Sequence, residues 1–136
     1  RKMSKSYGNT IPLFEPEKAL RKLIMRIKTN SLPPEAPKDP DTCTLFQIYQ
    51  AFATVEETAT MRTRYAQGIG WGEMKQTLFE YLNARLSEPR QRYQELLEKP
   101  DHIEQILKRG AARAREYSVP FLHELRRAVG IRPLDA

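Results

Sequence analysis

The stretch that decides the fold is Glu73–Lys99, EMKQTLFEYLNARLSEPRQRYQELLEK, which is the longest amphipathic segment of this 136-residue chain. Apolar side chains recur in it at intervals typical of one helix face, at Met74, Leu78, Tyr81, Leu82, Leu86, Tyr93 and Leu96. Pro89 lies inside the stretch, and we expect it to kink or divide the helix near Ser87 and Glu88.

Helical spacing continues on the N-terminal side of this stretch. A helix is expected from Pro16, with one buried face formed by Leu20, Leu23, Ile24 and Ile27. Thr42 or Thr44 could cap a second helix, whose buried face would contain Leu45, Ile48, Tyr49 and Phe52. A third helix is expected over residues 55–67, with Glu56 and Glu57 in its first turn.

The remaining segments complete an all-helical pattern. Residues 29–41 contain four prolines, so they form an irregular connection and not a helix. A helix should begin at Pro100 and run to Tyr117, and a last one should span residues 119–129. No convincing strand is visible. We therefore predict an all-α antiparallel helical bundle.

Composition excludes several classes of protein. Hydrophobic residues make up 40% of the chain and charged residues 29%, which is enough apolar material for a core. Cys43 is the single cysteine, so an intramolecular disulfide is impossible. His102 and His123 are the two histidines, which with one cysteine are too few for the common zinc sites, so no metal site is expected. No apolar run reaches the roughly 20 residues of a membrane span. A cytoplasmic location is favoured.

Positive charge is concentrated at the two ends of the chain. Residues 1–28 hold eight basic and two acidic residues, residues 29–107 hold eight and twelve, and residues 108–136 hold seven and three. The ends could therefore present two phosphate-facing surfaces, although a solvated basic surface would have the same composition.

One short motif near the N-terminus has a specific chemical interpretation, Lys2-Met3-Ser4-Lys5-Ser6. Two lysines interleaved with hydroxyls, followed by Gly8 in a loop, can converge on a polyphosphate. Fixed cations of this kind stabilise a transition state in which charge moves onto a leaving pyrophosphate. The alternative is a basic, serine-rich tail.

The motif is similar to the KMSKS loop of class I aminoacyl-tRNA synthetases. The wider pattern resembles the bacterial tryptophanyl-tRNA synthetases, through residues 2–11, 13–14, 27–31, 70–75, 90–93 and 106–114. Three positions depart from the commoner pattern of that family: Asn30 where aspartate is frequent, Trp71 where tyrosine is frequent and Ala112 where glutamate is frequent.

The resemblance implies an enzyme that activates L-tryptophan with ATP and Mg²⁺ and attaches it to tRNA(Trp). By this resemblance Lys2 and Lys5 are the catalytic cations, and the ATP-binding residues are Lys2, Met3, Ser4, Lys5 and Ser6. Residues 1–14 would be the edge of the class I catalytic domain, whose Rossmann part is missing. Residues 15–136 would be a C-terminal α-helical anticodon-binding domain.

Further expectations concern the partners of the chain. Lys108, Arg109, Arg113 and Arg115 are a plausible strip for tRNA phosphates, since a spacing of four places Arg109 and Arg113 on one helix face. The parent enzyme is expected to be a homodimer.

Because the chain begins at Arg1 directly before the loop, it looks like an excised piece, and we expect it to be inactive alone. Two alternatives remain: a free-standing helical RNA-binding module, or a helical protein-interaction domain.

Overall fold

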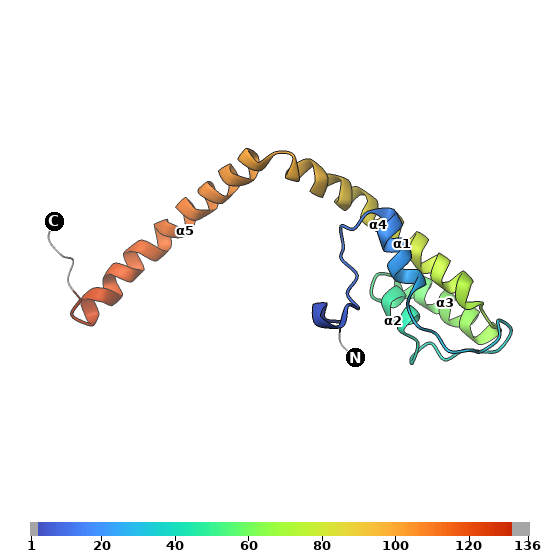
Figure 1. The fold of residues 1–136 in the computed structure, drawn as a ribbon. Helices are drawn as coiled ribbons and strands as arrows, with labels where there is room; N and C mark the ends of the chain where they lie inside the picture. The colour runs from blue at the N-terminus through green and yellow to red at the C-terminus, as the bar shows by residue number, and fades with distance from the viewer. Residues whose placement is uncertain (1–2, 132–136) are drawn as a thin grey trace. The chain divides into compact units, whose positions relative to one another are not determined.

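The computed structural model describes residues 3–131, in which helices are the only regular secondary structure (Figure 1). Its elements are the short 3₁₀ helix η1 (Lys5–Tyr7) and the helices α1 (Glu17–Met25), α2 (Thr44–Gln50), α3 (Val55–Gln67), α4 (Trp71–Leu97) and α5 (Pro100–Ala128). No strand occurs among the described residues, so the all-α prediction is confirmed. The chain forms two compact units, one ending at Tyr93 and the other beginning at Gln94.

The core of the first unit lies between α1, α2, α3 and the N-terminal half of α4. The first half of the predicted stripe on α4 is buried, at Met74, Leu78, Leu82 and Leu86, whereas Tyr93 is 39% exposed. The other buried apolar residues are Leu20, Ile24, Leu45, Phe46, Tyr49, Met61, Tyr65, Ile69 and Phe79. Each large apolar side chain removed from water contributes about 1.5–3 kcal/mol to folding.

Of the expected kink or division at Pro89, the division does not occur, and the expected break between residues 117 and 119 is wrong. Pro89 lies within α4 and does not divide it, and Pro120 lies within α5, so residues 100–128 form one helix and not two. A proline in a helix removes one backbone hydrogen bond and bends the path locally, but the turns on either side retain their own bonds. The helix therefore continues through both positions.

The start of α2 also differs from the prediction. Cys43 occupies the N-cap position, and no side chain caps the helix. The Thr42 hydroxyl instead donates to Asp39 Oδ2 at 2.9 Å, and Thr44 is already helical. Phe52 lies beyond the end of α2 and is 37% exposed, so the predicted buried face is correct only for its earlier members.

An exposed hydrogen-bonded cluster surrounds the start of α3. Thr54 and Glu57 form a capping box, in which the Thr54 amide donates to Glu57 Oε2 at 2.8 Å. The Tyr81 hydroxyl donates to the same carboxylate oxygen at 2.6 Å. These bonds favour the charged carboxylate, and the hydrogen bond from Tyr81 is the largest cause of the lowered pKa of Glu57.

Replacing Tyr81 with phenylalanine is expected to raise the pKa of Glu57 towards its ordinary value. A lowered folded-state pKa gives stability that is present near neutral pH and is lost as the pH falls through that pKa. The stability difference between the wild type and the variant should therefore shrink in acid. Carboxyl NMR titration and urea unfolding at two pH values measure both effects. Tyr117→Phe, at an exposed position, is the control, and an unchanged Glu57 titration in Tyr81→Phe would contradict the assignment.

The proline-rich connection is ordered by a buried lysine. Lys38 is 5% exposed, and its ammonium donates to the carbonyl oxygens of Pro33, Pro34 and Ala36 at 2.8, 3.1 and 2.9 Å. Its backbone amide donates to the Tyr65 carbonyl at 2.9 Å, which ties the connection to α3. These bonds satisfy carbonyl groups that no regular structure would satisfy.

Candidate functional site

Residues 4–9, which include the last three residues of the lysine- and serine-containing motif, form a closed turn. The Ser4 amide donates to Asn9 Oδ1 at 2.8 Å, and the Ser4 and Ser6 hydroxyl oxygens lie 2.8 Å apart. Gly8 ends the turn in the left-handed region with φ of 60°, where its amide donates to the Lys5 carbonyl. A residue with a Cβ is disfavoured in that conformation, so glycine at this position permits the turn.

The polar groups of this turn are accessible. Lys5 and Ser6 are exposed, and no ion pair involves Lys5 among the residues that the structure describes. Met3 is also exposed, whereas Ser4 is half-buried. Lys2 lies outside the described residues. The turn thus offers an ammonium group and a pair of hydroxyls to an anionic ligand.

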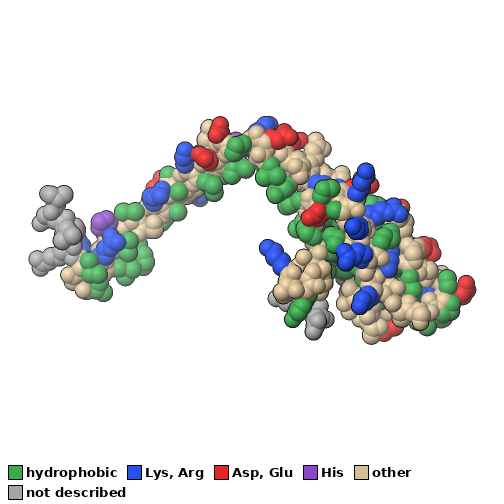
Figure 2. All heavy atoms as spheres, in the orientation of Figure 1, with side chains coloured by type: hydrophobic (Ala, Val, Ile, Leu, Met, Phe, Trp, Pro, Cys, Tyr) green, Lys and Arg blue, Asp and Glu red, His purple; other side chains and the backbone are tan. Residues whose placement is uncertain are grey.

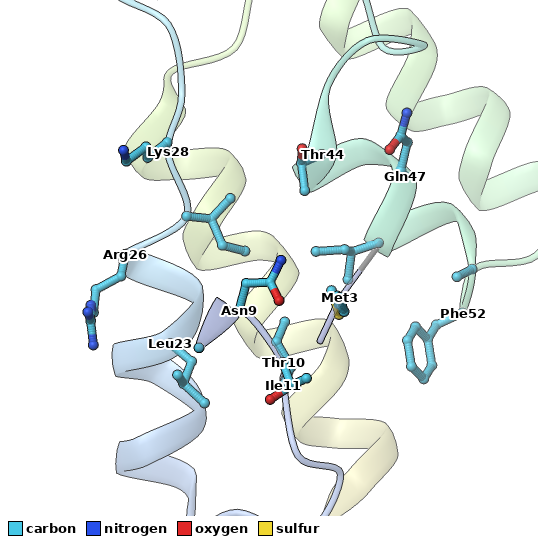
Figure 3. A pocket seen from close by; sticks show the side chains of 14 residues that line it. Met3, Asn9, Thr10, Ile11, Leu23, Arg26, Lys28, Thr44, Gln47 and Phe52 are labelled. Atoms are coloured by element: carbon cyan, nitrogen blue, oxygen red, sulfur yellow. The ribbon is translucent and has the colours of Figure 1, made fainter. Parts of the chain in front are cut away.

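A cleft of about 740 Å³ lies between this N-terminal segment, the C-terminal end of α1, and α2. Figure 3 shows Asn9 and Thr10 between the two helices, with Thr44 and Gln47 on the α2 side and Arg26 and Lys28 on the α1 side. The floor of the cleft is apolar, with Ile11, Leu23, Ile27 and Ile48. Sequence reasoning missed the α2 wall, because no local pattern indicates which face of α2 meets the loop.

A smaller pocket of about 300 Å³ lies beside the proline-rich connection. Trp71 Nε1 donates to Asn30 Oδ1 at 3.0 Å across it, and the Lys38 ammonium lies 5.3 Å from the Trp71 ring centroid. Asn30 and Trp71 are two of the positions that depart from the commoner family pattern, and they contact each other directly. Asn30, Trp71 and Lys38 therefore already have partners at this pocket.

Cys43 and Tyr65 meet in the core at the edge of this pocket. The Cys43 sulfur lies 3.3 Å from the Tyr65 hydroxyl oxygen. Burial is the largest cause of the raised pKa of Tyr65, and the hydrogen bond with Cys43 raises it further. This phenol therefore stays protonated at any physiological pH. Among the described residues no group of His, Cys, Asp and Glu side chains could hold a metal ion.

The predicted basic strip lies on α5. Its four residues, Lys108, Arg109, Arg113 and Arg115, are all exposed. A helix turns by about 100° per residue, so Lys108 and Arg115 lie about 20° apart around the helix axis, and Arg109 and Arg113 lie about 40° apart. The two pairs are separated from each other by about 100° or more around the axis. Lys108 pairs with Glu104 at 3.6 Å. The strip therefore consists of two pairs of cations that lie on different sides of α5.

Most of the rest of α5 is exposed as well, and Ile103 and Ala111 are half-buried. None of its described residues is buried, and its apolar side chains include Ile106, Leu107, Tyr117, Phe121 and Leu125. No helix in the described part of the chain is long and apolar enough to cross a membrane.

Comparison with known proteins places these features in a family context. No protein-family model matches the chain. It is 54% identical over 134 residues to a tryptophan–tRNA ligase of Pseudomonas aeruginosa and 52% identical over 134 residues to that of Neisseria meningitidis, covering 98% of the chain in both cases. The chain spans 30% and 40% of the lengths of these two curated relatives.

Solved structures agree with the sequence comparison. A tryptophanyl-tRNA synthetase from Campylobacter jejuni, crystallised with ADP and tryptophan, is 41% identical and matches 95% of this chain with a TM-score of 0.86. The match covers 41% of that protein. A second structure of the Campylobacter jejuni synthetase matches with a TM-score of 0.85.

Proposed function

We propose that this chain, which is homologous to the C-terminal helical part of the tryptophanyl-tRNA synthetases, supplies the ATP-phosphate loop and the tRNA-binding helices of a tryptophan–tRNA ligase. The observation that supports this most directly is the 54% identity to the Pseudomonas aeruginosa ligase across 98% of the chain. In this proposal residues 1–14 belong to the edge of the catalytic domain, and residues 15–136 form the helical anticodon-binding domain.

The loop acts on the triphosphate of ATP, which enters as its Mg²⁺ complex. Lys5, together with Lys2, holds the phosphates and stabilises the charge that develops on the departing pyrophosphate. Met3, Ser4 and Ser6 complete the contact with ATP. The exposed position of Lys5 and the Ser4–Ser6 hydroxyl pair support these roles. Such cations lower the barrier only where they bind the transition state more tightly than the ground state.

The helical part binds tRNA(Trp) through its phosphates. The cations Lys108, Arg109, Arg113 and Arg115 are exposed along α5, as a polyanion-binding surface requires. L-tryptophan is bound by a part of the ligase that this chain does not contain. The complete enzyme is a cytoplasmic homodimer in this proposal.

The isolated chain is expected to show no tryptophan-dependent ATP–pyrophosphate exchange. It spans 30–40% of the length of the two ligases, and tryptophan activation needs the tryptophan pocket that we place in the remainder. The exchange assay on purified chain, with a full-length ligase as positive control, measures this. Exchange that rises with tryptophan concentration and is absent from a Lys5→Ala preparation would contradict the proposed division of roles.

A further inference from the structure

Cations on α1 form a row on the face opposite the core. Lys18, Lys22 and Arg26 follow each other at intervals of four residues and are all exposed, whereas Leu20 and Ile24 on the other face are buried. With a rise of about 1.5 Å per residue, the row spans about 12 Å, with about 6 Å between successive members. Lys28 is also exposed and follows the C-terminal end of the helix, and Arg21 is exposed on the flank of the row, where its guanidinium lies 5.5 Å from the Phe79 ring centroid.

None of these cations has an acidic partner in the part of the chain that the structure describes. The ion pairs found among the described residues join Arg62 to Asp41, Arg64 to Glu73, Arg85 to Glu57 and Lys108 to Glu104, and none involves the α1 row. Figure 2 shows Lys and Arg side chains gathered over α1 on the face that it displays. Glu17, in the first turn, is the only acidic residue of the helix. The row therefore presents uncompensated positive charge to solvent.

The row leads to the cleft beside the lysine- and serine-containing turn. Arg26 and Lys28 line the α1 rim of the cleft, and their side chains point away from the space between α1 and α2 (Figure 3). The end of α1 is satisfied separately, because Lys75 Nζ donates to the Met25 carbonyl at 3.1 Å. Among residues 3–131 neither Arg26 nor Lys28 forms an ion pair, so both side chains can contact an external ligand.

We propose that the α1 row, defined as Lys18, Arg21, Lys22, Arg26 and Lys28, contacts the phosphate backbone of tRNA as a surface separate from the strip on α5. This inference rests on the proposed function. Evenly spaced cations fit a repeating polyanion. An acidic protein would also need apolar or aromatic anchors at the interface, and the large exposed hydrophobic residues of this structure include none between Glu17 and Lys28.

Salt titration of tRNA binding tests the proposal. The triple variant Lys18→Gln, Lys22→Gln and Arg26→Gln should make the negative slope of log affinity against log salt shallower by about 2–3, because three phosphate contacts are lost and each contributes about 0.7–0.9. The charge-matched control is Arg92→Gln, Lys99→Gln and Arg126→Gln, at exposed positions with no assigned role. The control should change the slope by less than half as much. Circular dichroism establishes that both variants are folded.

The outcomes separate this inference from the proposed function. Equal slopes for the two triple variants would overturn the α1 surface and leave the proposed function standing. A larger slope change for the α1 variant, combined with equal affinity of the wild type for tRNA(Trp) and unrelated tRNAs, would support the α1 surface while counting against a tryptophan-specific ligase.

Discussion

Alanine in place of Gly68 is expected to lower the free energy of unfolding of the first unit by about 3 kcal/mol, through backbone strain and overpacking together. Gly68 joins α3 to α4 with φ of 97°, a conformation that residues with a Cβ rarely adopt. A Cβ here would lie 2.7 Å from the Glu35 carbonyl oxygen and 2.8 Å from that of Pro34. Both atoms belong to the backbone of residues 33–36, in which three carbonyl groups accept hydrogen bonds from the Lys38 ammonium. Moving them aside would therefore strain or break these hydrogen bonds.

Urea unfolding followed by circular dichroism measures this loss. Gly72→Ala is the matched control, since no atom lies within 4 Å of the added Cβ and the position is in the first turn of α4. There alanine should be neutral or stabilising by up to about 0.5–1 kcal/mol, because it has the higher helix propensity. If the two variants unfold at the same urea concentration, the tight approach of residues 34–35 to Gly68 is incorrect.

The second large effect concerns catalysis. In a chimera, this chain replaces the matching segment of the Pseudomonas aeruginosa ligase, to which it is 54% identical. Lys5→Ala in that chimera is expected to lower the rate of tryptophan-dependent ATP–pyrophosphate exchange by about 10²–10³-fold, the usual effect of losing one group that stabilises transition-state charge. The loss should appear in kcat, with little change in the KM for tryptophan.

Lys99→Ala in the same chimera is the control, because Lys99 is exposed and has no assigned role. It removes the same charge and should leave the exchange rate unchanged. A Lys5→Ala chimera as active as the Lys99→Ala chimera would remove Lys5 from the catalytic residues.

Local signals in the sequence predicted much of the fold. The bounds of α3, Val55–Gln67, were predicted, and acidic residues do occupy its first turn. The start of α5 at Pro100 follows from the same kind of signal, since proline is tolerated in the first turn of a helix. Periodicity also predicted the buried face of the first half of α4, where each apolar residue meets the core.

The errors concern effects that act over longer distances. Pro89 and Pro120 are strong local signals for a break, but helix propagation on both sides overrides them. The hydrogen bonds of Lys38 to three carbonyl groups could not be predicted from the sequence, because a lysine among prolines is typical of an exposed loop. Tertiary packing alone places it in the interior.

The candidate site also has features that local sequence predicts and features that depend on contacts between distant segments. The motif itself predicted Lys5 and the serines, and the helical spacing already placed Arg109 near Arg113. The cleft depends on the contact between α2 and the N-terminal segment, which are far apart in the sequence. Spacing alone predicts most of the α1 row, since cations at intervals of four residues share one helix face.

Exchange activity of the chimera that carries the unaltered chain tests the central claim most directly. If the chain supplies the phosphate-binding loop of a tryptophan–tRNA ligase, the chimera should catalyse tryptophan-dependent ATP–pyrophosphate exchange within about tenfold of the Pseudomonas aeruginosa enzyme, a difference of about 1.4 kcal/mol in the barrier. A folded chimera that binds tryptophan but shows no exchange would contradict the claim.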